Sequence, residues 1–390
     1  MQIDILKTYN LSRYDSDMLQ LYLELKELVS ARFSGGINFR PHERIVFVLQ
    51  DLDFFISNAF PGFTLYNLQL ILRELDISNY FCAVISNIPN YQHHANMVRE
   101  ILSPTDIPLR GISSLHGSGS ITEFLNADTG QTNLNASQIT HSFISLSRLS
   151  RFHRTFFTAK LFENNLQNIG LVSYHNIPAS ADSHVDVYKT NIDNTSHHNV
   201  NFSLLYTVPF RRDNSTLILR QPQNQQLVRN FQSTVTNYIN FTDNNNIRDK
   251  IASTHFQTSV IQSALVFVGL ETTVTYPYPF VSTISFKGIA DKRPFIIFGA
   301  PGILKYLRDL GFKTFNRWWD ESYDLELDVE TRADMIIKIL NQLSTYSQTQ
   351  LQQLCLEMEE ILEYNYQYLL RPFVIQEKQK IENGLAVQFL

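Results

Sequence analysis

Cysteine is scarce in this sequence: Cys82 and Cys355 are the two among 390 residues. Two cysteines cannot build the disulfide framework of a small secreted domain, and they are too few for a four-cysteine zinc site. The paired histidines are adjacent, so a pair does not share a helix face as metal ligands four residues apart would; the pairs are His93-His94 and His197-His198. We therefore expect buried, apolar-like cysteines and no metal site.

Charged residues are also few. They make up 18% of the chain, and the formal net charge is −5. Proteins that bind nucleic acid or anionic membranes carry broad basic surfaces. The composition argues against a surface of this kind and leaves open a local basic cleft.

Long hydrophobic runs are absent. No apolar stretch approaches the roughly 18 residues that a membrane span requires. Residues 1–10 contain no basic stretch followed by an apolar run, which is the pattern of a signal peptide. We therefore expect a chain that is neither secreted nor inserted in a membrane, with a cytoplasmic location.

Hydrolase motifs are missing as well. The sequence has no Gly-x-Ser-x-Gly elbow and no His-Glu-x-x-His pair, and neither cysteine lies in a nucleophile signature. The turn Gly299-Ala-Pro-Gly302 lacks the Gly-Lys-Ser/Thr of a Walker loop and the full dinucleotide fingerprint. Hydrolase chemistry therefore loses support, and no catalytic base can be identified.

The sequence does contain the pattern of an α/β protein. Its length and its 44% hydrophobic content predict two domains with sizeable cores. Short β-branched and aromatic runs alternate with amphipathic segments, as in βαβ units on a parallel sheet. These patterns predict strands at 44–51, 80–86 and 139–145, and helices at 16–32, 65–75, 92–102 and 155–166. We predict an N-terminal α/β domain over residues 1–175.

A second α/β domain is predicted over residues 250–345. Its expected strands are 264–269 and 294–299, and its expected helices are 301–311 and 329–343. A further helix is expected at 347–370, with Pro372 ending it. Residues 176–249 are rich in Asn, Ser and Thr and predict a loop-rich insertion or linker. Residues 346–390 are assigned to a C-terminal helix and tail.

A basic cluster lies where the strand at 139–145 leads into a helix. Ligands of parallel α/β sheets bind beyond the carboxyl ends of the strands. A helix N-terminus carries unpaired N–H groups and partial positive charge. Arg151 and Arg154 therefore predict an anion site, and the structural alternative is that they solvate a surface turn.

Three further loops carry candidate ligand contacts. Glu271 directly follows the strand at 264–269, and its carboxylate could accept hydrogen bonds from ribose hydroxyls. Lys287, near a predicted helix start, could meet a phosphate, and Gly299 and Gly302 would let the backbone approach one. The structural alternatives are a capping glutamate, a solvated helix lysine and a plain turn.

An aromatic and acidic segment, Trp318-Trp-Asp-Glu-Ser-Tyr-Asp324, completes the candidates. Its indoles and carboxylates could hold a sugar or a metal, although no spacing in it defines a metal site. The structural alternative is helix capping and packing.

Residues 280–324 resemble a region of glycosyltransferases that are common in tailed phages. The segments that carry the resemblance are Pro294-Phe-Ile296, Leu310-Gly-Phe-Lys-Thr-Phe315 and Asp320-Glu-Ser-Tyr-Asp324, together with the Arg-x-x-Arg pair Arg151 and Arg154. Those proteins look like distant relatives of GT-B fucosyltransferases. The resemblance covers the last third of the chain and the short arginine stretch. It implies two Rossmann-like domains of the GT-B type, an N-terminal acceptor domain and a C-terminal donor domain.

The resemblance also implies a donor site. A nucleotide-sugar would be bound by Glu271, Ser285 and Lys287, with Arg151 and Arg154 on the diphosphate and with no metal or other cofactor required. The sequence departs from the family where a Thr-Glu-Lys motif is expected, because its Glu and Lys fall at Thr283 and Ile284. Neither residue can replace a carboxylate or a cation.

These observations predict a glycosyltransferase that moves a sugar from a nucleotide-sugar to an unidentified acceptor, in the host cytoplasm if the chain is viral. The departure at Thr283 and Ile284 motivates an alternative, a catalytically inactive GT-B-like binding or assembly protein of a virus. A third possibility is a transferase acting on modified viral DNA bases. The acidic balance of the chain disfavours a nucleic-acid partner.

Overall fold

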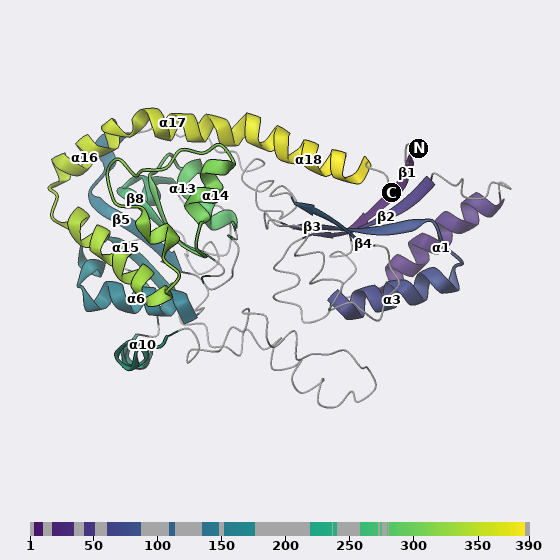
Figure 1. The fold of residues 1–390 in the computed structure, drawn as a ribbon, viewed down its shortest axis with the longest axis horizontal. Coiled ribbons are helices and arrows are strands. Elements are labelled where there is room, and N and C mark those ends of the chain that lie inside the picture. The colour runs from purple at the N-terminus through teal and green to yellow at the C-terminus, as the bar shows by residue number, and fades with distance from the viewer. Residues whose placement is uncertain are drawn as a thin grey trace. The chain divides into compact units, whose positions relative to one another are not determined.

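The protein is a mixed α/β structure with two parallel sheets and many helices (Figure 1). The computed structural model divides the chain into two units, each made of separate segments. The first unit contains Met1–Gly119, Asp182–Val208 and Gln376–Leu390, and the second contains Ser120–Ala181 and Pro209–Ile375. The structure describes residues 4–10, 18–34, 43–50, 61–86, 109–113, 135–147, 152–175, 219–235, 237–239, 258–271, 274, 279 and 281–386.

The first unit contains a sheet of four parallel strands in the order β1-β2-β3-β4. Two described helices, α1 (Met18–Ser34) and α3 (Pro61–Glu74), lie in the connections and contact each other. The strands are β1 (Asp4–Asn10), β2 (Glu43–Gln50), β3 (Tyr80–Ser86) and β4 (Leu109–Ser113). The predicted strands at 44–51 and 80–86 and the helices at 16–32 and 65–75 are confirmed.

Both faces of this sheet are covered. Alternate residues of a strand point to opposite faces, and Phe47 packs with Leu21 of α1 and Leu68 of α3. On the other face, Val46 and Phe81 pack with Ile381 of α18 (Val374–Ala386). Strands that are buried on both faces have continuous hydrophobic sequences, which is why β2 and β3 were recognisable.

The second unit contains a five-stranded sheet in the order β7-β6-β5-β8-β9. All neighbouring strands are parallel except β6 and β7. The chain moves outward from β5 to β7 and then continues on the other side of β5, so the direction of strand order reverses between β5 and β8. The strands are β5 (His141–Ser147), β6 (Leu171–His175), β7 (Asn237–Ile239), β8 (Ala264–Leu270) and β9 (Phe295–Phe298).

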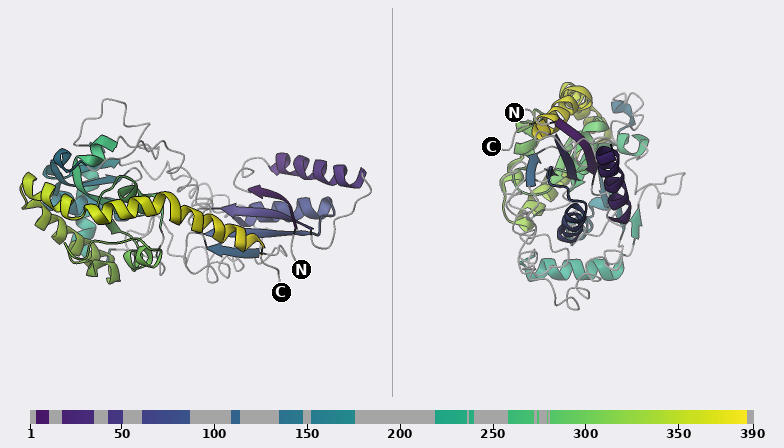
Figure 2. Two further views of the ribbon diagram at one scale, coloured as in Figure 1. Left: turned by 90° about the horizontal axis from the view of Figure 1, so that it is seen from above. Right: turned by 90° about the vertical axis from the view of Figure 1, so that its right-hand side faces the viewer.

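Helices pack on both faces of this second sheet (Figures 1 and 2). Phe298 of β9 contacts Phe157 of α6, with ring centroids 5.0 Å apart. On the opposite face, Ile284 of α13 packs against Phe267 of β8. The helices are α6 (Phe152–Glu163), α10 (Pro222–Thr234), α12 (Thr258–Gln262), α13 (Thr283–Ala290), α14 (Ile303–Asp309), α15 (Val329–Ser344), α16 (Gln348–Glu357) and α17 (Glu359–Tyr368).

Two expectations are corrected by this architecture. The boundary predicted at residue 175 differs from the observed division, because β5 pairs with β8 and therefore brings β5, α6 and β6 into the second unit. Pro372 does not end the last helix. It lies in a π-helical turn, η7 (Leu369–Phe373), which connects α17 to α18. The wider turn accommodates a residue that has no N–H to donate.

Candidate functional site

The reversal of strand order places a topological switch point at the carboxyl ends of β5 and β8. In open α/β sheets this is the position where ligands bind. Glu271 directly follows β8, and α6 is the helix that comes after β5. The predicted residues Arg154, Glu271 and Ser285 all lie here, within the second unit.

Glu271 is fully buried, with an exposed fraction of 0%. Its Oε1 accepts hydrogen bonds from the backbone N of Ser282 at 2.9 Å and from Oγ of Ser285 at 2.5 Å. Its Oε2 accepts from Oγ of Ser282 at 2.7 Å. Ser282 is the N-cap of α13, so Glu271 makes the interactions of the capping glutamate that was the structural alternative for it.

The backbone carbonyl of Glu271 connects β8 to α6. It lies 2.8 Å from Nε2 of His153, and Nε of Arg154 donates to it at 3.4 Å. Because a carbonyl oxygen only accepts, His153 carries a proton on Nε2. Both side chains are buried, so Arg154 does not solvate a surface turn. Arg151 lies outside the described residues.

Lys287 lies in the last turn of α13, whereas the sequence predicted it near a helix start. The side chain is half-buried. Burial lowers the pKa of Lys287 to about 7, and the charge of Asp291 opposes this shift. Burial likewise raises the pKa of Asp291 to about 6, against the charges of Lys287 and Arg293. Glu271 therefore contacts Ser285, whereas Lys287 interacts electrostatically with Asp291.

The backbone of the glycine turn after β9 is hydrogen-bonded to Asp324. Gly302, with φ of +82°, is the N-cap of α14, and its N–H donates to the carbonyl of Asp324 at 2.6 Å. The carboxylate of Asp324 accepts from the backbone N of Leu304 at 2.8 Å and of Lys305 at 3.0 Å. These N–H groups are the ones that a phosphate would use, so a carboxylate of the chain occupies the start of α14.

Gly299 lies against the side chain of Glu271. A Cβ at this position would lie 3.0 Å from Cδ1 of Ile303 and 3.3 Å from Cβ of Glu271. A Cβ at this position would therefore require Ile303 or Glu271 to shift by a few tenths of an ångström.

Arg332 organises the same edge of the sheet and was missed by the sequence analysis. This buried residue of α15 donates to Val274 O at 2.9 Å, to Glu326 O at 2.8 Å and to Leu327 O at 3.1 Å, and it also donates to Gly299 O. Burial lowers its pKa to about 10. A signal was present, because Arg332 shares the apolar face of α15 with Val329 and Ile336 at helical spacing.

The aromatic and acidic segment serves in capping and packing. Glu321 accepts from the backbone N of Phe315 at 2.7 Å, from Oγ1 of Thr314 at 2.8 Å and from Nη1 of Arg308 at 3.0 Å. Burial raises the pKa of Glu321, although these hydrogen bonds oppose the shift. In the part of the chain that the structure describes, no cluster of three or more His, Cys, Asp or Glu side chains could hold a metal ion.

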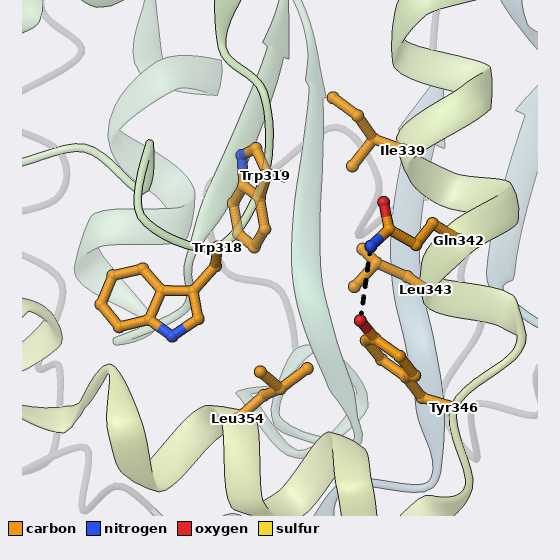
Figure 3. Close-up of a pocket in the computed structure, with 7 residues that line it drawn as sticks. All are labelled: Trp318, Trp319, Ile339, Gln342, Leu343, Tyr346 and Leu354. Carbon is orange, nitrogen blue, oxygen red and sulfur yellow. Dashed lines mark hydrogen bonds between the residues drawn. The ribbon is translucent and has the colours of Figure 1, made fainter.

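The two tryptophans of this segment line a small pocket with a volume of about 10 Å³ (Figure 3). Its other walls come from α15, α16 and the connection between them. Phe315 packs against Trp319, at 5.5 Å between ring centroids, and against Phe295, at 5.1 Å. Since Phe295 is the first residue of β9, the pocket lies near the amino end of this strand, away from the switch point.

Comparisons with known proteins provide no relative: no family model, no curated protein and no solved structure matches this chain. Among the described helices, none has both the length and the apolar character needed to cross a bilayer.

Proposed function

We propose that the chain is a glycosyltransferase of the GT-B type, which binds a nucleotide-sugar donor at the carboxyl edge of the second sheet. The observation that supports this most directly is the switch point between β5 and β8, where Arg154, Glu271 and Ser285 lie together. In this proposal the second unit is a Rossmann-like donor domain. The described strands of the first sheet follow one another without a reversal, so the first unit is assigned to the acceptor.

The diphosphate is assigned to the start of α6. Three described helices begin at this edge after a strand, namely α6, α13 and α14. The carboxylate of Glu271 already accepts from Ser282, the N-cap of α13, and that of Asp324 accepts from the N–H groups of Leu304 and Lys305 in the first turn of α14. The start of α6 carries Arg154, and a cation near a helix N-terminus suits a diphosphate whose charge grows as it leaves the sugar.

Glu271 then has a positioning role. Its carboxylate fixes Ser282 and Ser285 at the start of α13, and its carbonyl orients His153 and Arg154. This role replaces the direct ribose contact that the sequence predicted, because both carboxylate oxygens are engaged and the residue is fully buried.

The proposal is tested with a thermal-shift screen of nucleoside diphosphates and their sugars, with and without divalent metal. A ligand that binds the folded state selectively stabilises it, by about 2.7 kcal/mol at a hundredfold excess over Kd. We expect a shift with one nucleotide class, reduced in Arg154→Met and retained in Lys305→Met, which removes an exposed cation from α14. Absence of a shift with every nucleotide would overturn the donor site.

A second candidate is a GT-B-like binding or assembly protein without transferase activity. The engagement of Glu271 by two serines and the occupation of α14 by Asp324 favour it, as does the uncharged pair at Thr283 and Ile284. The two candidates differ in turnover. Release of free nucleoside diphosphate from the stabilising nucleotide-sugar supports the transferase, and tight binding without release supports the binding protein.

A further inference from the structure

The two most exposed large hydrophobic residues in the described part of the chain lie close together in one loop. Leu327 has an exposed fraction of 79% and Leu325 one of 68%, where η6 (Ser322–Leu325) leads into α15. A single exposed leucine is ordinary. Two on one short loop can be buried by the same partner, and burial of apolar side chains is favourable.

Hydrogen bonds hold this loop in one conformation. Nε of Arg332 donates to the carbonyl of Glu326 at 2.8 Å, and its Nη2 donates to that of Leu327 at 3.1 Å. The backbone N of Asp328 donates to Oε1 of Glu326 at 2.8 Å. Asp328 in turn caps α15 by accepting from the backbone N of Thr331 at 2.8 Å. A loop that is already ordered loses little entropy when a partner binds to it.

The sequence around the two leucines is acidic. Residues 320–330 contain six carboxylates and no basic residue. The six are Asp320, Glu321, Asp324, Glu326, Asp328 and Glu330. Asp324 and Glu330 are buried and accept N–H groups of the chain, and Glu321 pairs with Arg308 at 3.0 Å. The remaining three carboxylates therefore determine the charge that a partner meets.

Two of these three keep their negative charge at neutral pH. Asp320 is exposed and Asp328 is partly exposed. Hydrogen bonds from Ser322 lower the pKa of Asp320, and hydrogen bonds from Thr331 lower that of Asp328. The leucines are thus accompanied by ionised carboxylates on the same loop.

This combination disfavours several partners. In a symmetric dimer the same patch of each copy meets itself, which would bring like charges together at a cost. Nucleic acids and anionic membranes carry the same sign of charge as the loop. A partner that suits both the leucines and the carboxylates is apolar on one face and cationic beside it.

We propose that the loop at residues 325–328 docks a cationic amphipathic helix of a partner protein. Glu326 has extended backbone, with φ of −70° and ψ of 122°, and two residues of extended chain advance roughly 6–7 Å. Four residues of α-helix advance about 6 Å. Leu325 and Leu327 therefore match apolar side chains one turn apart on a helix, the spacing by which amphipathic helices are recognised. The inference does not depend on the proposed donor site.

Binding is measured by fluorescence anisotropy with the full-length protein and a labelled synthetic helix of leucine and lysine. One control peptide has the same composition in scrambled order and no apolar face, and another has glutamate in place of every lysine. We expect saturable binding of the leucine-lysine helix that weakens with added salt. Both control peptides should bind much more weakly.

Substitution of the two leucines tests their part in binding. The double variant Leu325→Ser, Leu327→Ser should weaken binding of the leucine-lysine helix by about tenfold or more, a change of roughly 1.4 kcal/mol. Leu356→Ser, at a 51% exposed leucine of α16, is the matched control and should bind as the wild type does. Both variants should keep the wild-type urea-unfolding curve and any nucleotide-induced thermal shift.

A charge variant separates the contribution of the carboxylates. Asp320→Asn should mainly slow association with the leucine-lysine helix, because charges at the rim of an interface act chiefly on the rate of encounter. Stopped-flow mixing at low and high salt measures this rate. An association rate that is unchanged in the variant at low salt would contradict the role of Asp320.

Three outcomes would overturn the proposal. The first is the absence of saturable binding of the leucine-lysine helix. The second is equal binding by the wild type and the double serine variant, because the peptide would then bind elsewhere or through charge alone. The third is a dimer of the free protein in sedimentation velocity that the double serine variant abolishes, because a second copy would then cover the loop.

Discussion

The hydroxyl of Ser285 donates a hydrogen bond of 2.5 Å to Oε1 of Glu271, inside the second unit. Hydrogen bonds to a buried charge contribute about 1.5–3 kcal/mol each. Glu271→Gln presents an amide group to one of the three donors and should lower the free energy of unfolding by about 2 kcal/mol. Urea denaturation measures the difference. Glu360→Gln, at a 92% exposed side chain, is the control and should change stability little.

Arg332 should be intolerant of substitution. Arg332→Lys keeps the charge but cannot reach carbonyls in several loops at once, since an ammonium lacks the planar fork of a guanidinium. We expect a loss of about 3 kcal/mol of unfolding free energy. Arg229→Lys, on the exposed side of α10, should be nearly neutral in the same denaturation experiment. Equal losses in the two variants would contradict the role of Arg332.

Substitutions at Gly302 measure the cost of backbone conformation without a steric clash. No atom lies within 4 Å of a Cβ built on Gly302, yet its φ is +82°. Gly302→Ala should therefore cost about 1 kcal/mol from conformation alone. Gly302→Asn should cost less, because asparagine tolerates the left-handed region. Thermal unfolding of the two variants gives the order, and an alanine variant more stable than the asparagine variant would contradict this explanation.

Lys287 and Asp291 predict a specific dependence of stability on pH. Between pH 7 and 10.5 the unfolded lysine binds a proton that the folded one has lost, so stability rises with pH. Between pH 3.8 and 6 the folded aspartate holds a proton that the unfolded one has lost, so stability falls as pH rises. The pair therefore contributes least near pH 6 to 7.

Removing both charges tests the predicted direction of this pH dependence. The double variant Lys287→Met, Asp291→Asn should be more stable than the wild type near pH 6.5, by about 1 kcal/mol because Lys287 is only partly buried. The difference should shrink at pH 9 and at pH 4.5. Urea midpoints measured across this range would reject the prediction if the difference stayed constant.

Local pattern was sufficient to predict most of the individual elements. Hydrophobic runs placed β2, β3, β8 and β9, and amphipathic periodicity placed α1, α3 and α15. Helix α10 lies inside the region that composition assigned to loops. These signals are local, because each depends on the spacing of apolar residues within one segment.

The partners of each strand and the roles of buried charged residues could not be predicted from local sequence patterns. The pairing of Phe143 in β5 with Val266 in β8 joins residues more than a hundred positions apart, and a strand pattern does not specify its neighbour. Glu271 and Asp324 were recognised as candidates for ligand contacts, whereas their carboxylates accept from the N-cap residue of α13 and from an N–H group of α14, respectively. A free phosphate site and a capping carboxylate require the same helix N-terminus, so sequence alone does not distinguish them.

The segments of the two units alternate along the chain, and this sets the order in which each unit can be completed during translation. Domains synthesised first usually fold first on the ribosome. Here a nascent chain that ends at residue 375 already holds every segment of the second unit and still lacks residues 376–390 of the first. Ile381, which covers Val46 and Phe81, belongs to that missing segment. The N-terminal unit is therefore the last to close, because this apolar face of its sheet lacks Ile381 until synthesis has passed this residue.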